Sequence, residues 1–487
     1  MHQVIRRAWD WISLLTRRTG VLFVPALSTL TTLLRQPIAR CRLAIVVALI
    51  LVCAYAAGVI SYVMLTPDIG IRCAFTPVVN HFNPAFLFQT NAEPLQGDDT
   101  IVQLGDQEVS NWAQILHVLV DLRRTEGEIG TEADLSPESK KTHLVVKGVE
   151  IIRVRYHRVG DPPVDDPQAI IRTVWLRVGR PPLATLAPSL LWFLLKIGLF
   201  VVGAIVFWKR PQDRSASQFF LFCLVSFGAY MGGYHWWRIV TQPTLILVFI
   251  VCSVLLPAVS LHFYLVFPRP KAILDRVPQR VLLLLYGPPV FFLLLLISRY
   301  FRIRWLYQNG SDVGLSLDEM LFEIYCYFGV AALWYLASVV CLVHSYRTAV
   351  GATERNQVKW ILFGTLASLA PIGYSLYLAL AERQRFGGGA ATWPMFFASV
   401  CVTVAFTISI TRYRLMQLDQ LISSGVVYFL ISSLVGLIYY GLVFAGMVLL
   451  GSHVIAGPSL GQVLAASSTV LMLLVGRDLL RDRLTSA

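Results

Sequence analysis

Residues 43–65 read LAIVVALILVCAYAAGVISYVML and contain no charged side chain. A run of about 20 apolar residues is long enough to cross the hydrocarbon core of a bilayer as a helix. Similar runs recur along the chain and predict an α-helical multi-pass membrane bundle of about ten spans. The spans are expected near residues 43–65, 185–208, 217–237, 243–267, 280–298, 320–344, 358–380, 393–411, 424–450 and 460–476.

Composition and charge support a membrane protein. Of 487 residues, 56% are hydrophobic and only 14% are charged, whereas a soluble globule carries about 25% charged residues. The net charge of +13 would suggest a nucleic-acid partner in a soluble protein. Here the basic residues gather in alternate connections and in the segment 1–42, as the positive-inside rule requires of cytoplasmic segments. The charge therefore sets orientation and attracts anionic membrane lipids, and no nucleic-acid partner is expected.

The order of segments predicts the domain organisation. Residues 1–42 form a basic cytoplasmic segment that is too long for the start of a cleavable signal peptide, so 43–65 is an uncleaved first transmembrane anchor. The polar block 66–184 then lies outside the cytoplasm, and 185–476 form a bundle of about nine helices. An even number of spans returns the C-terminus to the cytoplasm, where 477–487 begin a further helix.

The polar block has the pattern of one α+β domain. Residues 143–158 and 170–178 carry β-branched residues at strand-like spacing. Between 66 and 143 one helix is expected, capped by Ser110 or Asn111, with Trp112 as the first residue of its apolar stripe.

The run PLQGDDTIVQLGDQEV at 94–109, followed by this helix, resembles a bacterial PDZ domain. The resemblance implies a groove that captures a peptide C-terminus beside the helix. Trp112 and a loop at 83–88 are the candidate ligand contacts, with Asn83, Ala85, Phe86 and Leu87 as the loop residues. The Gly-Asp-x-Ile spacing has one extra residue, and the loop has a proline and no glycine. A PDZ-like spacer or dimer contact without a ligand is the alternative.

Short motifs at the membrane boundaries carry a second resemblance. They are PSLLWF at 188–193, FWKRP at 207–211, LHFYLVFPRP at 261–270, NQVKW at 356–360, RYRLMQLD at 412–419 and GRDLLRDRL at 476–484. Over residues 43–487 the set is similar to the input region of bacterial multi-span sensor histidine kinases.

This second resemblance implies a function and a set of partners. The chain is expected in the bacterial cytoplasmic (inner) membrane, as a homodimer that signals to a cytoplasmic kinase or response regulator. No histidine has the context of a dimerisation helix, and no glycine-rich nucleotide box occurs. We therefore expect a sensor or receptor input module of a two-component system that is not itself an enzyme, with its output domain outside this chain.

Several polar and aromatic residues near the spans are candidate contacts for a peptide, or for an amphipathic or anionic signal. Lys196 lies near the middle of the second span, where a charge must pair, reach water or bind a ligand. Tyr234, His235 and Trp236 gather near the outer end of the third span. Arg302 and Trp305 form a second basic-aromatic group. The alternatives are a polar contact inside the bundle for Lys196 and an interfacial aromatic belt for the two groups.

Other classes of function have weaker support. A transporter or channel would show inverted repeats and midplane polar sites, and a membrane scaffold would hold a periplasmic partner through the polar block. No H-E-x-x-H motif occurs, and the G-x-S-x-G match at 457–461 lies in a predicted short loop. The eight cysteines contain no C-x-x-C pair. No catalytic residue, cofactor or metal site is expected.

Overall fold

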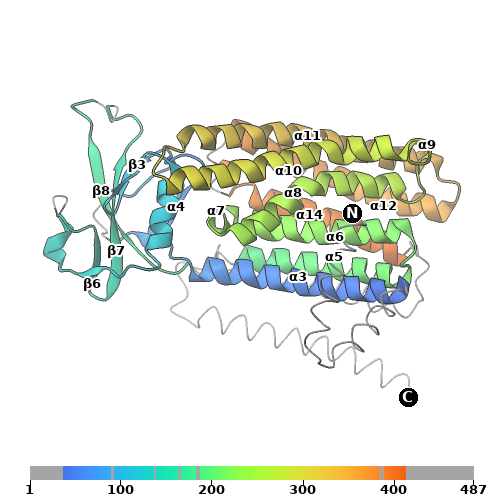
Figure 1. Ribbon diagram of the computed structural model, residues 1–487, viewed down its shortest axis with the longest axis horizontal. Helices are drawn as coiled ribbons and strands as arrows, with labels where there is room; N and C mark the ends of the chain where they lie inside the picture. Colours follow the sequence, from blue (N-terminus) through green and yellow to red (C-terminus); the bar gives the residue numbers. More distant parts are fainter. Residues whose placement is uncertain are drawn as a thin grey trace, which may run out of the picture.

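A computed structural model describes residues 37–88, 93–136, 139–162, 166–181, 187–382, 385–386 and 389–412. It shows a sheet domain (residues 66–181) at one end of a bundle of long helices (Figure 1). The ninth and tenth predicted spans, the segment 477–487 and nearly all of the segment 1–42 lie outside the described residues.

The described part of the bundle contains eight helices that are long and apolar enough to cross a membrane. They agree with the first eight predicted spans. The bundle helices and the two short helices between them are α3 (Pro37–Leu65), α5 (Ala187–Lys209), α6 (Arg214–Gly233), α7 (Trp236–Ile239), α8 (Pro243–Val266), α9 (Ala272–Arg276), α10 (Pro278–Gln308), α11 (Gly314–Thr348), α12 (Ala352–Ala381) and α14 (Thr392–Arg412).

The third span differs from its predicted bounds. It was expected to run to residue 237, but α6 ends at Gly233, and the short helix α7 follows as a separate element. Glycine is a poor helix former, so the pair Gly232-Gly233 is a natural place for the helix to stop. The chain then turns at His235 before α7 begins. Tyr234 and His235 therefore lie in the connection before α7, and Trp236 is the first residue of α7.

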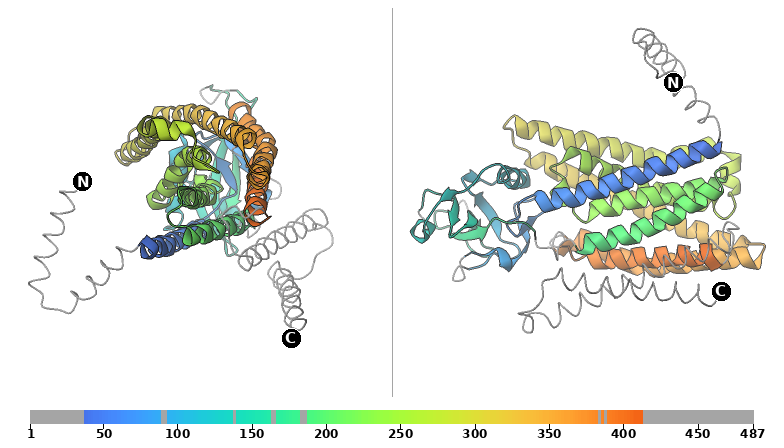
Figure 2. Two further views of the ribbon diagram at one scale, coloured as in Figure 1. Left: turned by 90° about the vertical axis from the view of Figure 1, so that its right-hand side faces the viewer. Right: turned by 90° about the horizontal axis from the view of Figure 1, so that it is seen from below.

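The helices pack through small residues and aromatic rings. α6 contacts α3, α5 and α8, and α14 lies beside α12 and α5 (Figure 2). A Cβ added at Gly228 of α6 would clash with the Cys252 Sγ of α8, so the glycine permits close approach of these helices. The bundle core includes Phe219, Phe222, Phe263 and Phe406.

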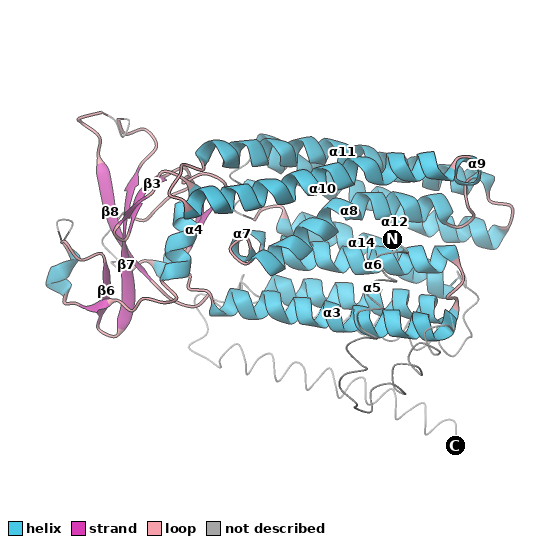
Figure 3. Ribbon diagram, in the orientation of Figure 1, coloured by secondary structure: helices cyan, strands magenta, loops and turns pink. Residues whose placement is uncertain are grey.

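Every strand in the described residues belongs to the sheet domain (Figure 3). A short antiparallel pair, β1 (Ile71–Cys73) and β2 (Val79–Phe82), precedes the main sheet. The main sheet has the order β4-β3-β7-β6-β5, with β8 also paired to β7. Its strands are β3 (Thr100–Leu104), β4 (Gln107–Glu108), β5 (Glu128–Ile129), β6 (His143–Val146), β7 (Val149–His157) and β8 (Ile171–Arg177).

The predicted helix of this domain is α4 (Trp112–Asp121), and Asn111 is its cap. The Asn111 side chain accepts from the Gln114 N–H, and the Gln114 side chain accepts in return from the Asn111 N–H, a reciprocal capping box. This α+β domain agrees with the predicted class, and its assignment as PDZ-like stays a prediction.

The sheet domain and the bundle share one apolar core. Trp112 and Leu119 of α4 belong to the same buried cluster as Ile303 of α10 and Leu317 of α11. The sheet domain is therefore packed on the helix ends through buried apolar contacts, in addition to its covalent connections to α3 and α5.

Candidate functional site

The short helix α7 is the centre of the junction between the sheet domain and the bundle. The Trp236 ring lies 5.4 Å from the ring of Phe75, which follows β1, and 5.7 Å from that of Trp112, the first residue of α4. Phe75 and Trp112 are themselves 5.3 Å apart. Aromatic pairs at these separations each contribute about 0.5–1.5 kcal/mol beyond the area they bury. The sequence-predicted candidates Trp112 and Trp236 thus meet in one cluster.

A buried ion pair joins the same two parts of the molecule. The Arg238 guanidinium of α7 donates to the Asp68 carboxylate just before β1, and each residue is only 7% exposed. Asp68 also accepts from the Gly70 N–H at 3.0 Å. Arg238 and Arg72 of β1 both stack on Trp237, at 4.6 and 5.2 Å from its ring. Removing one partner of such a pair leaves an uncompensated buried charge, which costs about 3–5 kcal/mol.

His235 is a buried, neutral group between α6 and α7. Its Nε2 shares a hydrogen bond with the Ser189 hydroxyl of α5, and its ring lies edge-on to Tyr234 at 4.6 Å. Burial, together with the positive charges of Arg238 and Arg72, lowers the pKa of His235 to about 3. The imidazole therefore carries no charge near neutral pH, and protonating it would place a third positive charge beside two arginines.

Lys196 lies deeper in the bundle and is only 4% exposed. Its Nζ stands 3.9 Å from the ring centre of Tyr230 and 6.0 Å from that of Trp192. No ion-pair partner of this amine occurs among the residues that the structure describes. A charge at mid-membrane costs at least about 2.5 kcal/mol, and the aromatic faces offset part of that cost, because a desolvated cation–π contact contributes about 2 kcal/mol.

One aromatic cluster connects Lys196 to the junction. Trp192 stacks on Tyr230 at 4.8 Å and meets Phe396 of α14 edge-on at 5.0 Å. Tyr234, next to His235, packs against the same cluster. The candidates Lys196, Tyr234, His235, Trp236 and Trp112 thus lie along one continuous path from the bundle interior to the sheet domain.

The candidate loop residues lie elsewhere in the sheet domain. Asn83 caps a single turn of 3-10 helix, η1 (Pro84–Phe86), by accepting from the Ala85 N–H at 3.1 Å. The Asn83 N–H donates to the Gly70 carbonyl. The N–H groups of Phe86 and Leu87 donate to the carbonyls of Asn83 and Pro84, respectively. Phe86 is buried beneath Gly70, where an added Cβ would lie 2.7 Å from the ring. The N–H groups that a peptide carboxylate would need here are already engaged within the domain.

Arg302 and Trp305 are exposed on α10 and do not join the site. The sequence pattern placed them in a connection after residue 298, but α10 continues as a helix to Gln308. Helical geometry turns neighbouring residues to different faces, so Ile303 packs in the shared core and Tyr307 meets His117 of α4 at 5.1 Å. The exposed position of Trp305 suits the interfacial belt, the alternative interpretation of this group.

Sequence reasoning missed several residues of the site. Asp68 follows the first span by three residues and is the acidic partner that Arg238 needs. The Trp192–Lys196 and Tyr230–Tyr234 pairs each have the i,i+4 spacing that places two side chains on one helix face, and this spacing would have linked Lys196 to the aromatic group.

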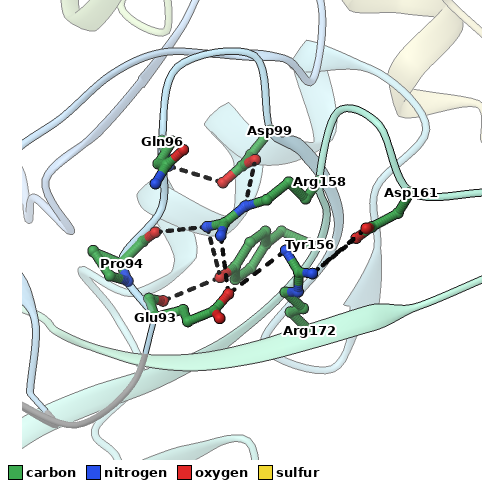
Figure 4. A network of polar contacts seen from close by, with 8 residues as sticks. All are labelled: Glu93, Pro94, Gln96, Asp99, Tyr156, Arg158, Asp161 and Arg172. Atoms are coloured by element: carbon green, nitrogen blue, oxygen red, sulfur yellow. Dashed lines mark hydrogen bonds and ion pairs between the residues drawn. The ribbon is translucent and has the colours of Figure 1, made fainter.

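A separate polar network stabilises the sheet domain away from the junction (Figure 4). Arg158 bridges Asp99, at 3.4 Å, and Glu93, at 2.9 Å, and Arg172 pairs with Asp161 at 3.3 Å. These contacts hold the loop that precedes β3 against the strands β7 and β8. Within the described residues, no group of three His, Cys, Asp or Glu side chains is placed to hold a metal ion.

The architecture defines a multi-pass membrane protein with one sheet domain on the ends of its helices. Residues 191–418 match the family model described as the N-terminal 7TM region of histidine kinase. All the candidate spans of the described residues except α3 fall in or overlap it. The family supports a membrane sensor input module, in agreement with the resemblance drawn from the boundary motifs. No curated protein and no solved structure matches the chain.

Proposed function

We propose that the chain is the input module of a two-component sensor, in which the sheet domain is extracytoplasmic and α7 transmits its state to the bundle. The observation that supports this role is the position of α7. It connects α6 to α8, and it carries both Trp236 and Arg238, which bind the sheet domain.

The physical basis of transmission is a change in packing. α6 and α8 run from the junction to the opposite end of the bundle without interruption, and packed helices shift as units. A peptide or amphipathic signal that alters the seating of the sheet domain on α7 therefore changes the relative stability of two packings of these helices. The signal then shifts the population between them, and a cytoplasmic kinase or response regulator reads the result.

The test uses the full chain in lipid nanodiscs and hydrogen–deuterium exchange. Trp236→Leu removes aromatic contacts with Phe75 and Trp112 that contribute about 1 kcal/mol, so exchange through undocking should rise about fivefold in β1 and α4. If α7 transmits the change, amide exchange in this variant should also be faster at the opposite end of the helix bundle, in residues 268–277 and 349–356.

The matched control is Trp305→Leu, an exposed tryptophan at the same end of the bundle. It should leave exchange at both ends unchanged. If Trp236→Leu loosens β1 and α4 but leaves the opposite end as in the unmodified chain, α7 only attaches the sheet domain and the proposed transmission is wrong.

We also propose that the chain is a homodimer, as its resemblance to the sensor kinases implies. Native mass spectrometry of the chain released from nanodiscs should show two copies per particle. A strictly monomeric chain at micromolar concentration would show that the proposed homodimer is wrong. The coupling through α7 would then be tested only by the hydrogen–deuterium exchange experiment.

A further inference from the structure

Two hydroxyl groups of α14 are buried in the bundle without a hydrogen-bond partner. Ser399 and Thr403 are 2% and 4% exposed, and the oxygen of each has no partner in the structure. Other buried or half-buried hydroxyls of the bundle helices donate to a carbonyl of the preceding turn, among them those of Ser338, Ser345, Thr365, Ser375 and Thr407. Ser399 and Thr403 depart from this pattern, so their hydrogen-bonding capacity is free.

The neighbours of these hydroxyls on α14 show which way they face. At about 100° per residue, Phe396, Ser399, Thr403 and Phe406 lie within an arc of about 80°. Phe396 contacts Trp192 of α5, and Phe406 lies 5.2 Å from Phe219 of α6. The two hydroxyls lie on the face between these contacts and are therefore directed toward α5 and α6.

Lys196 lies at the matching depth on α5. Both α5 and α14 run away from the sheet domain, and they lie side by side (Figure 2). From the Trp192–Phe396 contact, Lys196 is about 6 Å further along α5, while Ser399 and Thr403 are about 4.5 and 10.5 Å further along α14. The lysine is therefore level with the space between the two hydroxyls.

Aromatic rings enclose this polar layer on both sides. Trp192, Tyr230 and Phe396 lie toward the sheet domain, and Phe219 and Phe406 lie on the far side. Lys196 has aromatic faces but no acidic partner among the described residues. The layer thus contains one ammonium and two hydroxyl donors that have no partner among the described residues.

We propose that Lys196, Ser399 and Thr403 form an intramembrane site for a single carboxylate group. One ammonium balances one negative charge, and its N–H groups with two hydroxyls suit the two oxygens of a carboxylate. A phosphate dianion would need more positive charge than this layer supplies. The carboxylate comes from a membrane-dissolved fatty acid or from a small water-soluble acid. Binding at this site goes beyond the proposed coupling through α7 and does not depend on it.

The experiment measures carboxylate binding to the full chain in nanodiscs of zwitterionic lipid. Oleate labelled with ¹³C at its carboxyl carbon is titrated in one arm and ¹³C-labelled acetate in the other, with the carboxyl resonance as readout. The unmodified chain should give a saturable bound signal, and Lys196→Met should abolish it. Lys209→Met, which removes an exposed lysine at the far end of α5, should leave it unchanged.

A second variant keeps the test decisive if Lys196→Met fails to fold. The double substitution Ser399→Ala with Thr403→Val removes both hydroxyls at nearly constant volume, retains Lys196 and should weaken binding at least tenfold. Saturation by oleate alone assigns the site to a membrane-derived acid, and saturation by acetate assigns it to an aqueous one. Equal binding by the unmodified chain and Lys196→Met, or no saturable binding of either acid, overturns the proposal.

Discussion

Arg238 and Lys196 are both more than nine-tenths buried, but the protein compensates their charges in different ways. Arg238 is paired with Asp68, and the pair connects the sheet domain to α7. Lys196 rests on the faces of Tyr230 and Trp192 and has no ion-pair partner among the described residues. A buried charge that is paired within the protein stabilises one arrangement of the paired segments. A buried charge without an acidic partner is available to bind an anionic ligand. The junction is thus suited to attachment, and carboxylate recognition is the role that we propose for Lys196.

The largest expected effect comes from breaking the buried pair. Arg238→Met leaves Asp68 buried without a counter-charge and should lower the free energy of unfolding by about 3–5 kcal/mol. The measurement is an equilibrium unfolding titration in mixed micelles. The matched control is Lys147→Met, because Lys147 pairs with Glu132 at the surface of the sheet domain and is 72% exposed; surface pairs contribute little. Equal stabilities of the two variants would show that the Arg238–Asp68 pair does not hold the junction.

A smaller effect is expected from acid at the junction. The pKa of His235 is lowered to about 3 in the folded chain, whereas the unfolded chain has a pKa of about 6.5. The unfolded state therefore binds more protons, and the stability due to neutral His235 is complete above about pH 6.5 and declines as the pH falls toward 3. At pH 5 this contribution should have fallen by about 2 kcal/mol.

The variant that isolates this contribution is His235→Gln, which retains a hydrogen-bonding side chain beside Ser189. Unfolding titrations at pH 7 and pH 5 should show a smaller loss of stability for this variant than for the unmodified chain. Parallel losses in the two proteins would mean that His235 is not kept neutral by burial, and that the junction tolerates its protonation.

The smallest effect, and one of opposite sign, is expected from Lys196. Without a ligand, Lys196→Met removes a mid-membrane charge that costs at least about 2.5 kcal/mol, together with cation–π contacts that contribute about 2 kcal/mol. The free energy of unfolding in ligand-free micelles should therefore rise slightly, by about 0.5–1 kcal/mol. A fall like that of Arg238→Met would indicate that Lys196 is a structural cation with a partner of its own, and the contrast with Arg238 would disappear.

The sequence was sufficient for features that depend on local pattern. Eight long apolar helices and the capped helix α4 follow from apolar runs and from Asn111 with Gln114, and the structure contains them. Pairings between distant segments were not predictable. Asp68 and Arg238 are 170 residues apart, and nothing in either neighbourhood specifies the other. The continuation of α10 beyond residue 298 was also not predicted. A basic-aromatic stretch after an apolar run is as typical of a connection as of a continued helix.

The continued helices α10 and α11 have a mechanical consequence. Their 31 and 35 residues correspond to rods of about 46 and 52 Å, whereas the hydrocarbon core is about 30 Å thick. The excess length of α10 lies at the end that packs against the sheet domain. Helices adjust their tilt to bilayer thickness, and a tilt of about 5° displaces the end of a 52 Å rod by about 4–5 Å. In the proposed orientation, the height and angle of the sheet domain are therefore geometrically linked to the thickness of the membrane.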